Sequence, residues 1–311
     1  MYEKDDKLRK IILDLIKSNG PIHLSEFMSI CLYDSNYGYY KNSRVIGNKG
    51  DFITSPEISQ VFGELVGLWL GQTWVDRGKP SPFSLIELGP GNGTMMLDVL
   101  NTTKKIPGFT ESASIVLVES SQTLKAHQKS LLRDYNPIWI ENVLGIPEQP
   151  LFLIANEFLD ALPIRQFKKD NNIWHERYVA LSNNGELHFI YVPSNFDHEL
   201  NILYREVPDD ITVETSDITK SILSDLSEKI LRNGGVSLFI DYGYFNGFGE
   251  TLRDQCLDEL KDEQRIVLIM NSFEGFTSEK ISSVLEKPRN SVLTWLTKAK
   301  REFADCILGK E

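Results

Sequence analysis

The stretch Ser84-Leu-Ile-Glu-Leu-Gly-Pro-Gly-Asn-Gly93 decides the fold of this chain. Its first five residues form an apolar run with the length of a strand that is buried on both faces. Gly89, Gly91 and Gly93 permit a tight turn and let a ligand approach the backbone. Pro90 stands where a pyrophosphate-binding turn needs an N–H group, so the spacing indicates a small cofactor lying against the turn. A plain strand–helix turn is the alternative.

Short apolar runs and helical patterns alternate beyond this stretch. This order is typical of an open, mostly parallel sheet with helices between its strands. The sequence therefore predicts an α/β fold with a Rossmann-like core. Further strands are expected at Ser114–Val118, Leu151–Ala155 and Val236–Ile240, and helices at Thr94–Thr103, Gln122–Asp134 and Ser216–Arg232.

Other periodic patterns lie outside this alternation. Apolar residues at helical spacing predict helices over Lys7–Ser18, Leu24–Leu32 and Ile58–Trp74. The last pattern places Val61, Leu65, Leu68 and Trp69 on one face of its helix. The stretch Asn172–Tyr191 alternates with the period of a strand, which predicts an inserted β-hairpin that turns at Asn183-Asn-Gly185.

An acidic residue, Glu119, ends the second predicted strand. A carboxylate at this strand tip can accept hydrogen bonds from both hydroxyls of a ribose. Because the glycine turn comes one strand–helix unit earlier, the sequence favours ribose binding over an acid that merely ends a strand.

A polar cluster follows the third predicted strand. It consists of Asn156, Glu157 and Asp160, which we interpret as candidate catalytic residues. The carboxyl ends of parallel strands form the functional cleft of open sheets. Two acids there can bind a cation or orient a guanidinium group by paired hydrogen bonds. Asp160 can alternatively be a helix N-cap.

The segment Gly50–Gln60 is less regular. Ser55-Pro-Glu57 is typical of a helix start, with proline in the first turn. This interpretation explains Pro56 but leaves Thr54, Gln60 and Glu64 without a role.

Composition excludes several classes of protein. The chain has 311 residues, a net charge of −11, 41% hydrophobic and 25% charged residues, and three cysteines. These values argue against a disordered chain, a disulfide scaffold and a protein that coats nucleic acid. Cys31, Cys256 and Cys306 lie far apart, which indicates a reducing compartment and no zinc site. We expect no metal, no membrane span, no secretory signal and a bacterial-type cytoplasmic location.

Four ordered stretches carry a resemblance to a known family. They are Gly38-Tyr-Tyr40 with the segment 50–64, Glu87–Gly93, Asn156–Pro163 and Phe239–Gly243. Together they resemble the MidA family of class I S-adenosylmethionine-dependent methyltransferases over residues of about 20–251. This family includes the assembly-factor methyltransferase of mitochondrial NADH dehydrogenase.

The resemblance implies a cofactor site for S-adenosylmethionine. Glu87 and the three glycines of the turn would hold the amino-acid part of the cofactor, and Glu119 would hold its ribose. The segment that contains Thr54, Pro56 and Glu57 would cover the cofactor and shape the acceptor site.

The resemblance also implies a protein substrate. Family members are linked to arginine methylation on a subunit of the respiratory dehydrogenase. In that role Glu157 or Asp160 would pair with the substrate guanidinium, with Asn156 beside them.

The C-terminal part of the chain has a different character. Residues 280–301 hold six basic residues and one acid, a local charge of +5, which is often only a solvated helix face. A helix, a turn and a basic helix follow one another over residues 257–308. Through Gln264-Arg265, Glu274–Ile281 and Pro288–Val292, this region resembles region 4 of bacterial sigma factors of the extracytoplasmic-function type.

This second resemblance implies promoter DNA and RNA polymerase as partners. Residues facing the bases or the phosphates would be Arg289, Asn290, Thr294, Lys298, Lys300 and Arg301. A helical cap that packs on the sheet is the alternative interpretation.

The sequence thus predicts three regions. Residues 1–80 form a helical, cofactor-covering segment, residues 81–250 the methyltransferase core, and residues 251–311 a three-helix domain. The main hypothesis is a protein methyltransferase joined to a sigma-region-4-like domain. The alternative is a DNA-binding regulator whose α/β part only senses S-adenosylmethionine or a partner. The join after about Thr251 is either a working fusion or a junction of two truncated genes.

Overall fold

The computed structural model describes residues 2–41, 55–204, 207–241, 288–295 and 297–298. The chain divides into two compact units, Met1–Gly247 and Phe248–Glu311, which are described separately below.

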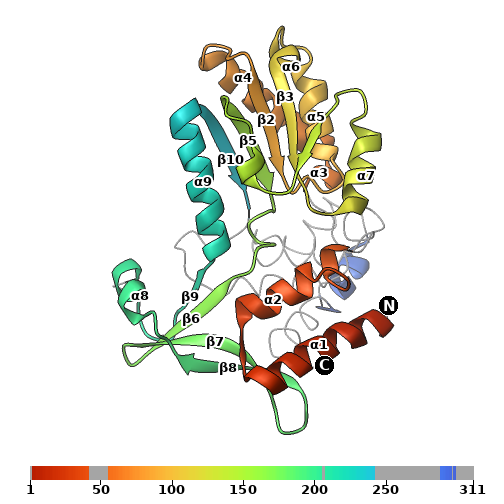
Figure 1. The fold of residues 1–311 in the computed structure, drawn as a ribbon. Helices are drawn as coiled ribbons and strands as arrows, with labels where there is room; N and C mark the ends of the chain where they lie inside the picture. The colour runs from red at the N-terminus through yellow and green to blue at the C-terminus, as the bar shows by residue number, and fades with distance from the viewer. Residues whose placement is uncertain (1, 42–54, 205–206, 242–287, 296, 299–311) are drawn as a thin grey trace. The chain divides into compact units, whose positions relative to one another are not determined.

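A parallel sheet with helices beside it forms one part of the first unit (Figure 1). All four pairings between neighbouring strands are parallel, which confirms the predicted α/β core. The predicted apolar runs become strands because the inner strands are covered on both faces. The strand order is β10-β5-β2-β3-β4, with β2 (Phe83–Leu88), β3 (Ala113–Val118), β4 (Ile138–Ile140), β5 (Leu151–Asn156) and β10 (Gly235–Ile240).

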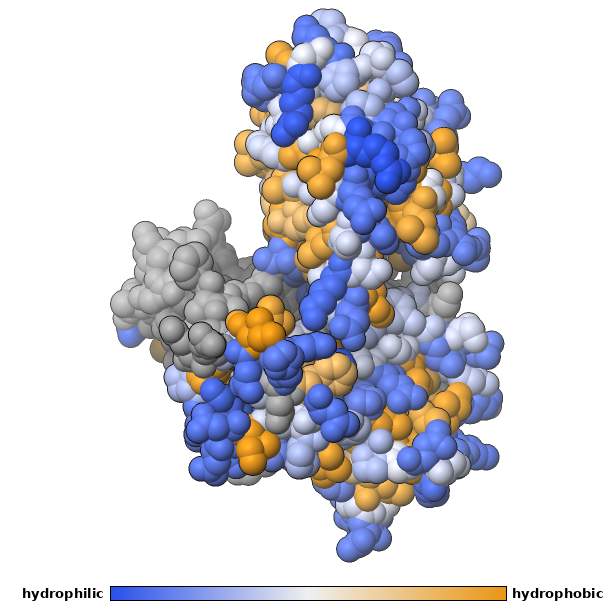
Figure 2. Space-filling view, turned by 60° about the vertical axis from the view of Figure 1, so that its left-hand side comes forward, coloured by the Kyte–Doolittle hydropathy of each residue, from blue (hydrophilic) through white to orange (hydrophobic). Residues whose placement is uncertain are grey.

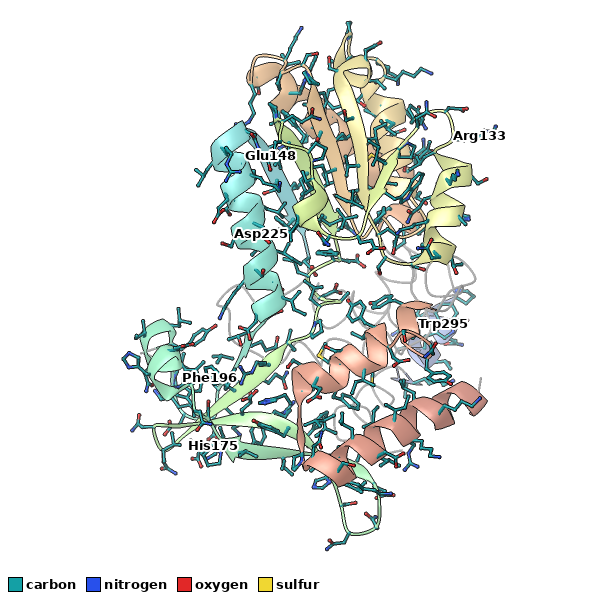
Figure 3. The ribbon with its side chains drawn as sticks, viewed as in Figure 1. Arg133, Glu148, His175, Phe196, Asp225 and Trp295 are labelled. Atoms are coloured by element: carbon teal, nitrogen blue, oxygen red, sulfur yellow. The ribbon has the colours of Figure 1, made fainter. Side chains whose placement is uncertain are left out.

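Helices connect these strands, and two of them begin at a capping serine. Ser121 caps α7 (Gln122–Leu131), and Ser216 caps α9 (Asp217–Asn233), each through its side-chain oxygen. Near its carboxyl end α9 is fixed by Glu148, labelled in Figure 3, which accepts a 2.6 Å hydrogen bond from Lys229. The remaining short helices of this part are α5 (Thr94–Thr103), α6 (Phe109–Ser112) and the 3-10 turn η2 (Val143–Gly145).

The helical segment before β2 buries a different face from the one that carries most of its large apolar side chains. It forms as α3 (Ser55–Ile58) and α4 (Gln60–Asp76). The face that bears Val61, Leu65, Leu68 and Trp69 is exposed, with the first three 58%, 60% and 55% accessible. Apolar side chains also reach the surface elsewhere and form orange patches in Figure 2.

A stripe of glycines explains this orientation of α4. Gly63, Gly67 and Gly71 are spaced by four residues and lie on the buried face. A β-carbon at Gly63 would lie 2.6 Å from Asp98 Cβ, and one at Gly67 would lie 3.1 Å from Val99 Cα. The glycines therefore allow α4 to pack directly against the backbone of α5.

An antiparallel sheet extends well beyond the predicted hairpin. In the stretch 172–191, β7 (Ile173–Leu181) pairs with β8 (Leu187–Pro193). On its other side β7 pairs with β1 (Ile22–His23) and β6 (Arg165–Asp170), and β6 pairs with β9 (Thr212–Thr215). The helix α8 (Asp197–Leu203) follows β8. Sequence analysis did not predict β1, β6 or β9, because these strands are short or rich in charged residues.

The N-terminal helices pack on this antiparallel sheet. Both predicted helices are present, as α1 (Tyr2–Asn19) and α2 (Leu24–Tyr33), and the 3-10 turn η1 (Tyr39–Lys41) follows them. Their contact is apolar, since Ile12, Ile16 and Ile22 form one buried cluster with Val179 of β7.

In the second unit, residues 289–295 and 297–298 are helical, and Val292 is fully buried. These residues lie within the helix predicted over Asn290–Ala304. The two other helices predicted for the tail fall outside the described residues. Among the residues that the structure describes, no helix combines the length and the apolar character that a membrane crossing requires.

Candidate cofactor site and active site

The glycine turn joins β2 to α5 with an unusual backbone. Gly89, Gly91 and Gly93 have φ angles of 59°, 53° and 87°, in the left-handed region that favours glycine. Gly93 also stands at the N-cap of α5, where it has no side chain of its own to cap the helix. The turn thus presents bare backbone at a helix N-terminus, as the sequence predicts for a ligand-binding turn.

Glu87 lies at the end of β2, just before this turn, and is 3% exposed. Burial raises the pKa of its carboxyl to about 8, although a hydrogen bond from the Met96 backbone lowers it in part. Its Oε2 atom has no hydrogen-bond partner among the described residues. An unpaired buried carboxylate oxygen is costly, so this position suits a ligand that brings its own donor, such as an ammonium group.

Glu119 follows β3 and is oriented by two hydrogen bonds. Its Oε1 accepts from the Ser121 backbone at 2.7 Å, and its Oε2 accepts from Gln128 Nε2 at 3.2 Å. Burial raises the pKa of the carboxyl, and these two hydrogen bonds lower it in part. The Ser120 backbone also hydrogen-bonds this carboxylate, and a carboxylate has about four acceptor positions, so Glu119 can still accept a hydroxyl donor.

Gln128 of α7 links this carboxylate to the glycine turn. Its Nε2 also donates to the Gly91 carbonyl at 2.7 Å, and its Oε1 accepts from Trp139 Nε1 at 2.8 Å. The side chain is fully buried. Gln128 was not among the predicted site residues, and its sequence signal was only an amide on the inward face of a predicted helix.

Glu57 of α3 contacts the start of α5. Its Oε1 accepts from Thr94 Oγ1 at 2.7 Å and from Asn92 Nδ2 at 3.3 Å. Pro56 beside it is buried. Glu57 therefore joins the N-terminal segment to the glycine turn, whereas Thr54 lies outside the described residues.

The polar cluster after β5 is shaped by a residue from another strand. Asp241, just after β10, accepts hydrogen bonds from the Leu159 and Asp160 backbone N–H groups at 2.9 and 3.2 Å. Glu157 has a φ angle of 49°, a conformation that non-glycine residues rarely adopt. The Oδ1 atom of Asn156 has no partner among the described residues. Asp241 belongs to the Phe239–Gly243 motif, but sequence analysis did not count it as a site residue.

Two aromatic residues connect this cluster with the rest of the site. Phe158 packs on the glycine turn, since a β-carbon at Gly89 would lie 2.8 Å from its ring. Tyr33 of α2 donates its hydroxyl to the Ala161 carbonyl at 2.6 Å. Burial raises the pKa of Tyr33, and the nearby carboxylates of Asp160 and Glu119 raise it further. Tyr33 of α2 is therefore near both the cluster after β5 and Glu119 after β3, so these three parts surround one region.

The predicted DNA-facing residues lie in the second unit. Arg289, Asn290, Thr294 and Lys298 are exposed positions of its helical segment. The Thr294 hydroxyl donates to the Asn290 carbonyl at 2.8 Å within that segment. Lys300 and Arg301 fall outside the described residues. Within the described parts of both units, no group of histidine, cysteine and acidic residues is arranged to hold a metal ion.

Residues 65–270 match the model of a family of S-adenosyl-L-methionine-dependent methyltransferases. The chain belongs to this family. Its geometry fits the cofactor, because the orphaned Glu87 oxygen, the glycine backbone and the Glu119 carboxylate lie at the carboxyl end of the parallel strands. Residues 254–303 match a second model, that of region 4 of sigma-70.

Several relatives of this methyltransferase family are proteins named as protein arginine methyltransferase NDUFAF7 or its homolog, mitochondrial. The Caenorhabditis elegans protein is 35% identical over 269 residues, which cover 78% of this chain and 63% of the relative. The human protein is 34% identical over 298 residues, with coverages of 88% and 66%. The chain thus spans less than two thirds of the length of these relatives.

A solved structure has the same fold. It is a superfamily member from Burkholderia thailandensis bound to S-adenosyl-homocysteine, with a TM-score of 0.66 and 23% identity. The match covers 78% of this chain and 64% of that protein.

Proposed function

We propose that this chain is an S-adenosylmethionine-dependent methyltransferase that acts on an arginine side chain of a protein. The arrangement of Glu119 carries the proposal: a buried carboxylate, fixed by Ser121 and Gln128, stands beside a glycine turn. The names of the relatives support arginine as the acceptor. A subunit of respiratory NADH dehydrogenase is the proposed substrate.

Two carboxylates near the ends of the parallel strands would bind different parts of the cofactor. Glu119 would accept hydrogen bonds from the ribose, and Glu87 would face the amino group. When bound, S-adenosylmethionine supplies an electrophilic methyl group. Alignment of the acceptor and exclusion of water then contribute most of the acceleration.

The cluster after β5 would hold the acceptor. A guanidinium group offers planar pairs of N–H donors, which carboxylates bind in a bidentate manner. Glu157 or Asp160 would pair with it, and the Asn156 Oδ1 atom would accept a further hydrogen bond. Asp241 would act as a positioning residue because it binds the backbone of the loop that carries Asp160.

Calorimetry of the full-length chain tests the cofactor site. S-adenosyl-homocysteine should bind to the wild type, and Glu119→Ala should weaken binding by about 30- to 100-fold, the value of a charged hydrogen-bonding group. Glu111→Ala, which removes an exposed acid, should leave binding unchanged. Equal affinity in Glu119→Ala would remove this carboxylate from the site.

A second experiment tests the reaction. Purified respiratory NADH dehydrogenase is incubated with the chain and methyl-labelled S-adenosylmethionine, and its arginines are analysed by mass spectrometry. Methylated arginine that disappears with Glu119→Ala supports the proposal. Cofactor binding without any label on the dehydrogenase would reject this substrate.

The match of residues 254–303 to sigma-70 region 4 favours a second function, binding of promoter DNA by the C-terminal region in a bacterial-type cytoplasm. Fluorescence anisotropy of the full-length chain with a promoter duplex tests it. Arg289→Ala should weaken binding, and affinity should fall steeply with salt. Affinity that neither salt nor this substitution changes would reject DNA binding.

A further inference from the structure

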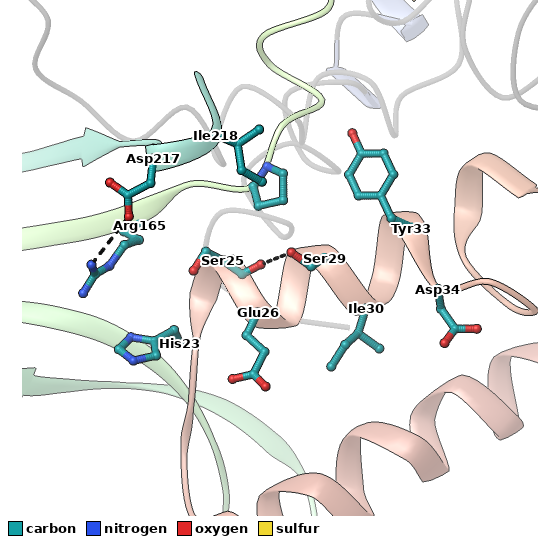
Figure 4. Close-up of a pocket in the computed structure, with 11 residues that line it drawn as sticks. His23, Ser25, Glu26, Ser29, Ile30, Tyr33, Asp34, Arg165, Asp217 and Ile218 are labelled. Carbon is teal, nitrogen blue, oxygen red and sulfur yellow. Dashed lines mark hydrogen bonds and ion pairs between the residues drawn. The ribbon is translucent and has the colours of Figure 1, made fainter. Parts of the chain in front are cut away.

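Two adjoining pockets lie between α2 and the antiparallel sheet, and we call them together the α2 groove. The first has a volume of about 500 Å³ and the second about 340 Å³. They share His23, Ser25, Arg165 and Asp217, so the hollow is continuous. Figure 4 shows α2 along the first pocket, opposite Asp217 and Ile218.

The α2 groove is long enough for a polypeptide segment. Its lining runs from His23 to Asp34, the whole length of α2. At 1.5 Å per helical residue this is roughly 16 Å, which corresponds to about five residues of an extended chain. A compact small molecule would need only part of this length.

Acidic groups dominate the lining. Four carboxylates, those of Glu26, Asp34, Glu176 and Asp217, and one guanidinium, that of Arg165, line the two pockets. With His23 counted as neutral, the formal charge of these described lining residues is therefore −3. Glu26 and Asp34 form no ion pair with another described residue, so no cation there balances their charge. Asp34 Oδ1 accepts hydrogen bonds from the Asn36 and Tyr37 backbone at 2.9 and 2.8 Å, which leaves its Oδ2 for a ligand.

The one cation among the described residues that line the groove is already neutralised. Arg165 binds Glu176 with two hydrogen bonds of 2.7 and 2.6 Å, and its guanidinium lies 4.3 Å from the ring of Phe196, labelled in Figure 3. His23 Nδ1 lies 3.0 Å from the same Glu176 carboxylate. The charge of Arg165 is thus balanced by Glu176, so Arg165 would not repel a basic ligand.

One end of the α2 groove borders the proposed acceptor site. Tyr33 lines the first pocket, and its hydroxyl binds the Ala161 carbonyl next to Asp160. A polypeptide in the groove would therefore bring its side chains to the cluster after β5 at this end.

We propose that the α2 groove binds a basic, extended segment of the protein substrate, with the acceptor arginine at the Tyr33 end and flanking lysine or arginine residues beside Glu26 and Asp34. This inference rests on the proposed function. It names the substrate class as a cationic stretch of polypeptide and assigns α2 as the surface that selects it.

Fluorescence anisotropy of the full-length chain, saturated with S-adenosyl-homocysteine, tests the groove. The probe is a fluorescein-labelled nonapeptide with one central arginine flanked by lysine and glycine. Glu26→Lys replaces attraction by repulsion at an exposed position and should raise the dissociation constant about five- to tenfold. The matched variant Glu228→Lys makes the same charge change on an exposed part of α9 outside the groove and should change it less than twofold.

Three outcomes would overturn the proposal. They are equal weakening by both substitutions, equal binding of a peptide with glutamate in place of lysine, and competition by spermidine at the same charge concentration, which would indicate a polyamine. Calorimetry with S-adenosyl-homocysteine separates the two hypotheses. Cofactor binding without selective binding of the basic peptide rejects the groove alone, whereas absence of cofactor binding rejects the proposed function.

Discussion

Each of the two sheets buries a glutamate, but their surroundings differ. Glu87 in the parallel sheet and Glu176 in the antiparallel sheet are 3% and 2% exposed. Arg165 binds both oxygens of Glu176, and His23 lies beside it. Glu87 instead keeps one oxygen without a described partner. A buried carboxyl that the protein itself pairs with a cation is satisfied within the fold, whereas one left without a partner indicates where a ligand binds.

The strongest effect is expected from breaking the neutralised pair. Arg165→Met would leave Glu176 buried with only His23 beside it and should lower the free energy of unfolding by about 3–5 kcal/mol. Urea unfolding followed by tryptophan fluorescence measures this loss. The double variant Arg165→Met/Glu176→Leu should recover most of it, and an equal loss in both variants would show that Arg165 matters only through packing.

A smaller effect is expected from the glutamate without a cation. Burial raises the pKa of Glu87 from 4.5 to about 8. The native state therefore keeps a proton that the unfolded chain has lost, so the contribution of Glu87 to stability should be greatest below pH 4.5 and fall as pH rises to about 8. Glu87→Gln should abolish this fall, with a difference on the order of 3 kcal/mol near pH 8.

Urea unfolding at pH 5, 6, 7 and 8 checks this prediction. Glu111→Gln, at an exposed position of α6 just before β3, serves as the control and should follow the wild-type profile. Parallel profiles for the wild type and Glu87→Gln would mean that Glu87 is ionised in the native state.

The network around Glu119 should have an effect of about tenfold on affinity. Gln128→Met would remove the amide that joins Glu119 to Gly91, and S-adenosyl-homocysteine should then bind about tenfold more weakly, since a hydrogen bond to a charged group contributes about 1.5 kcal/mol. Gln149→Met is the matched control, because Gln149 bonds to Ser84 at the other end of β2. Unchanged affinity in Gln128→Met would exclude a positioning role.

The smallest expected effect is the number of protons that cofactor binding releases. If the amino group of the cofactor lies beside Glu87, binding at pH 7 should ionise this carboxyl and release up to about one proton. Calorimetry in two buffers of different ionisation enthalpy measures the release. Glu87→Gln should release none, and equal release by both proteins would place the amino group elsewhere.

Local sequence patterns predicted the parallel sheet well. The apolar runs that become β2, β3, β5 and β10 are continuous, because inner strands of a parallel sheet are covered on both faces. The glycine turn could also be predicted, because few other residues adopt the φ angles of Gly89, Gly91 and Gly93.

The orientation of α4 could not be predicted in the same way. Its large apolar residues suggested the buried face, but the glycines at positions 63, 67 and 71 pack against α5 instead. Close backbone packing depends on the shape of the partner helix, which hydropathy does not encode.

The partners of the site residues were also beyond prediction. Gln128 meets Glu119, Asp241 meets the loop after β5, and Tyr33 meets Ala161, although these residues are distant in sequence or lack any periodic signal. Hydrogen bonds between such residues depend on the final packing of strands and helices.

The sequence by itself determined the strand–helix alternation, the glycine turn and the acid that follows β3, because each is a local consequence of burial or backbone conformation. The tertiary structure alone decided which buried carboxylate is neutralised and which is left for a ligand. It also formed the α2 groove, because His23, Arg165 and Asp217 come from three separate segments that only folding brings together.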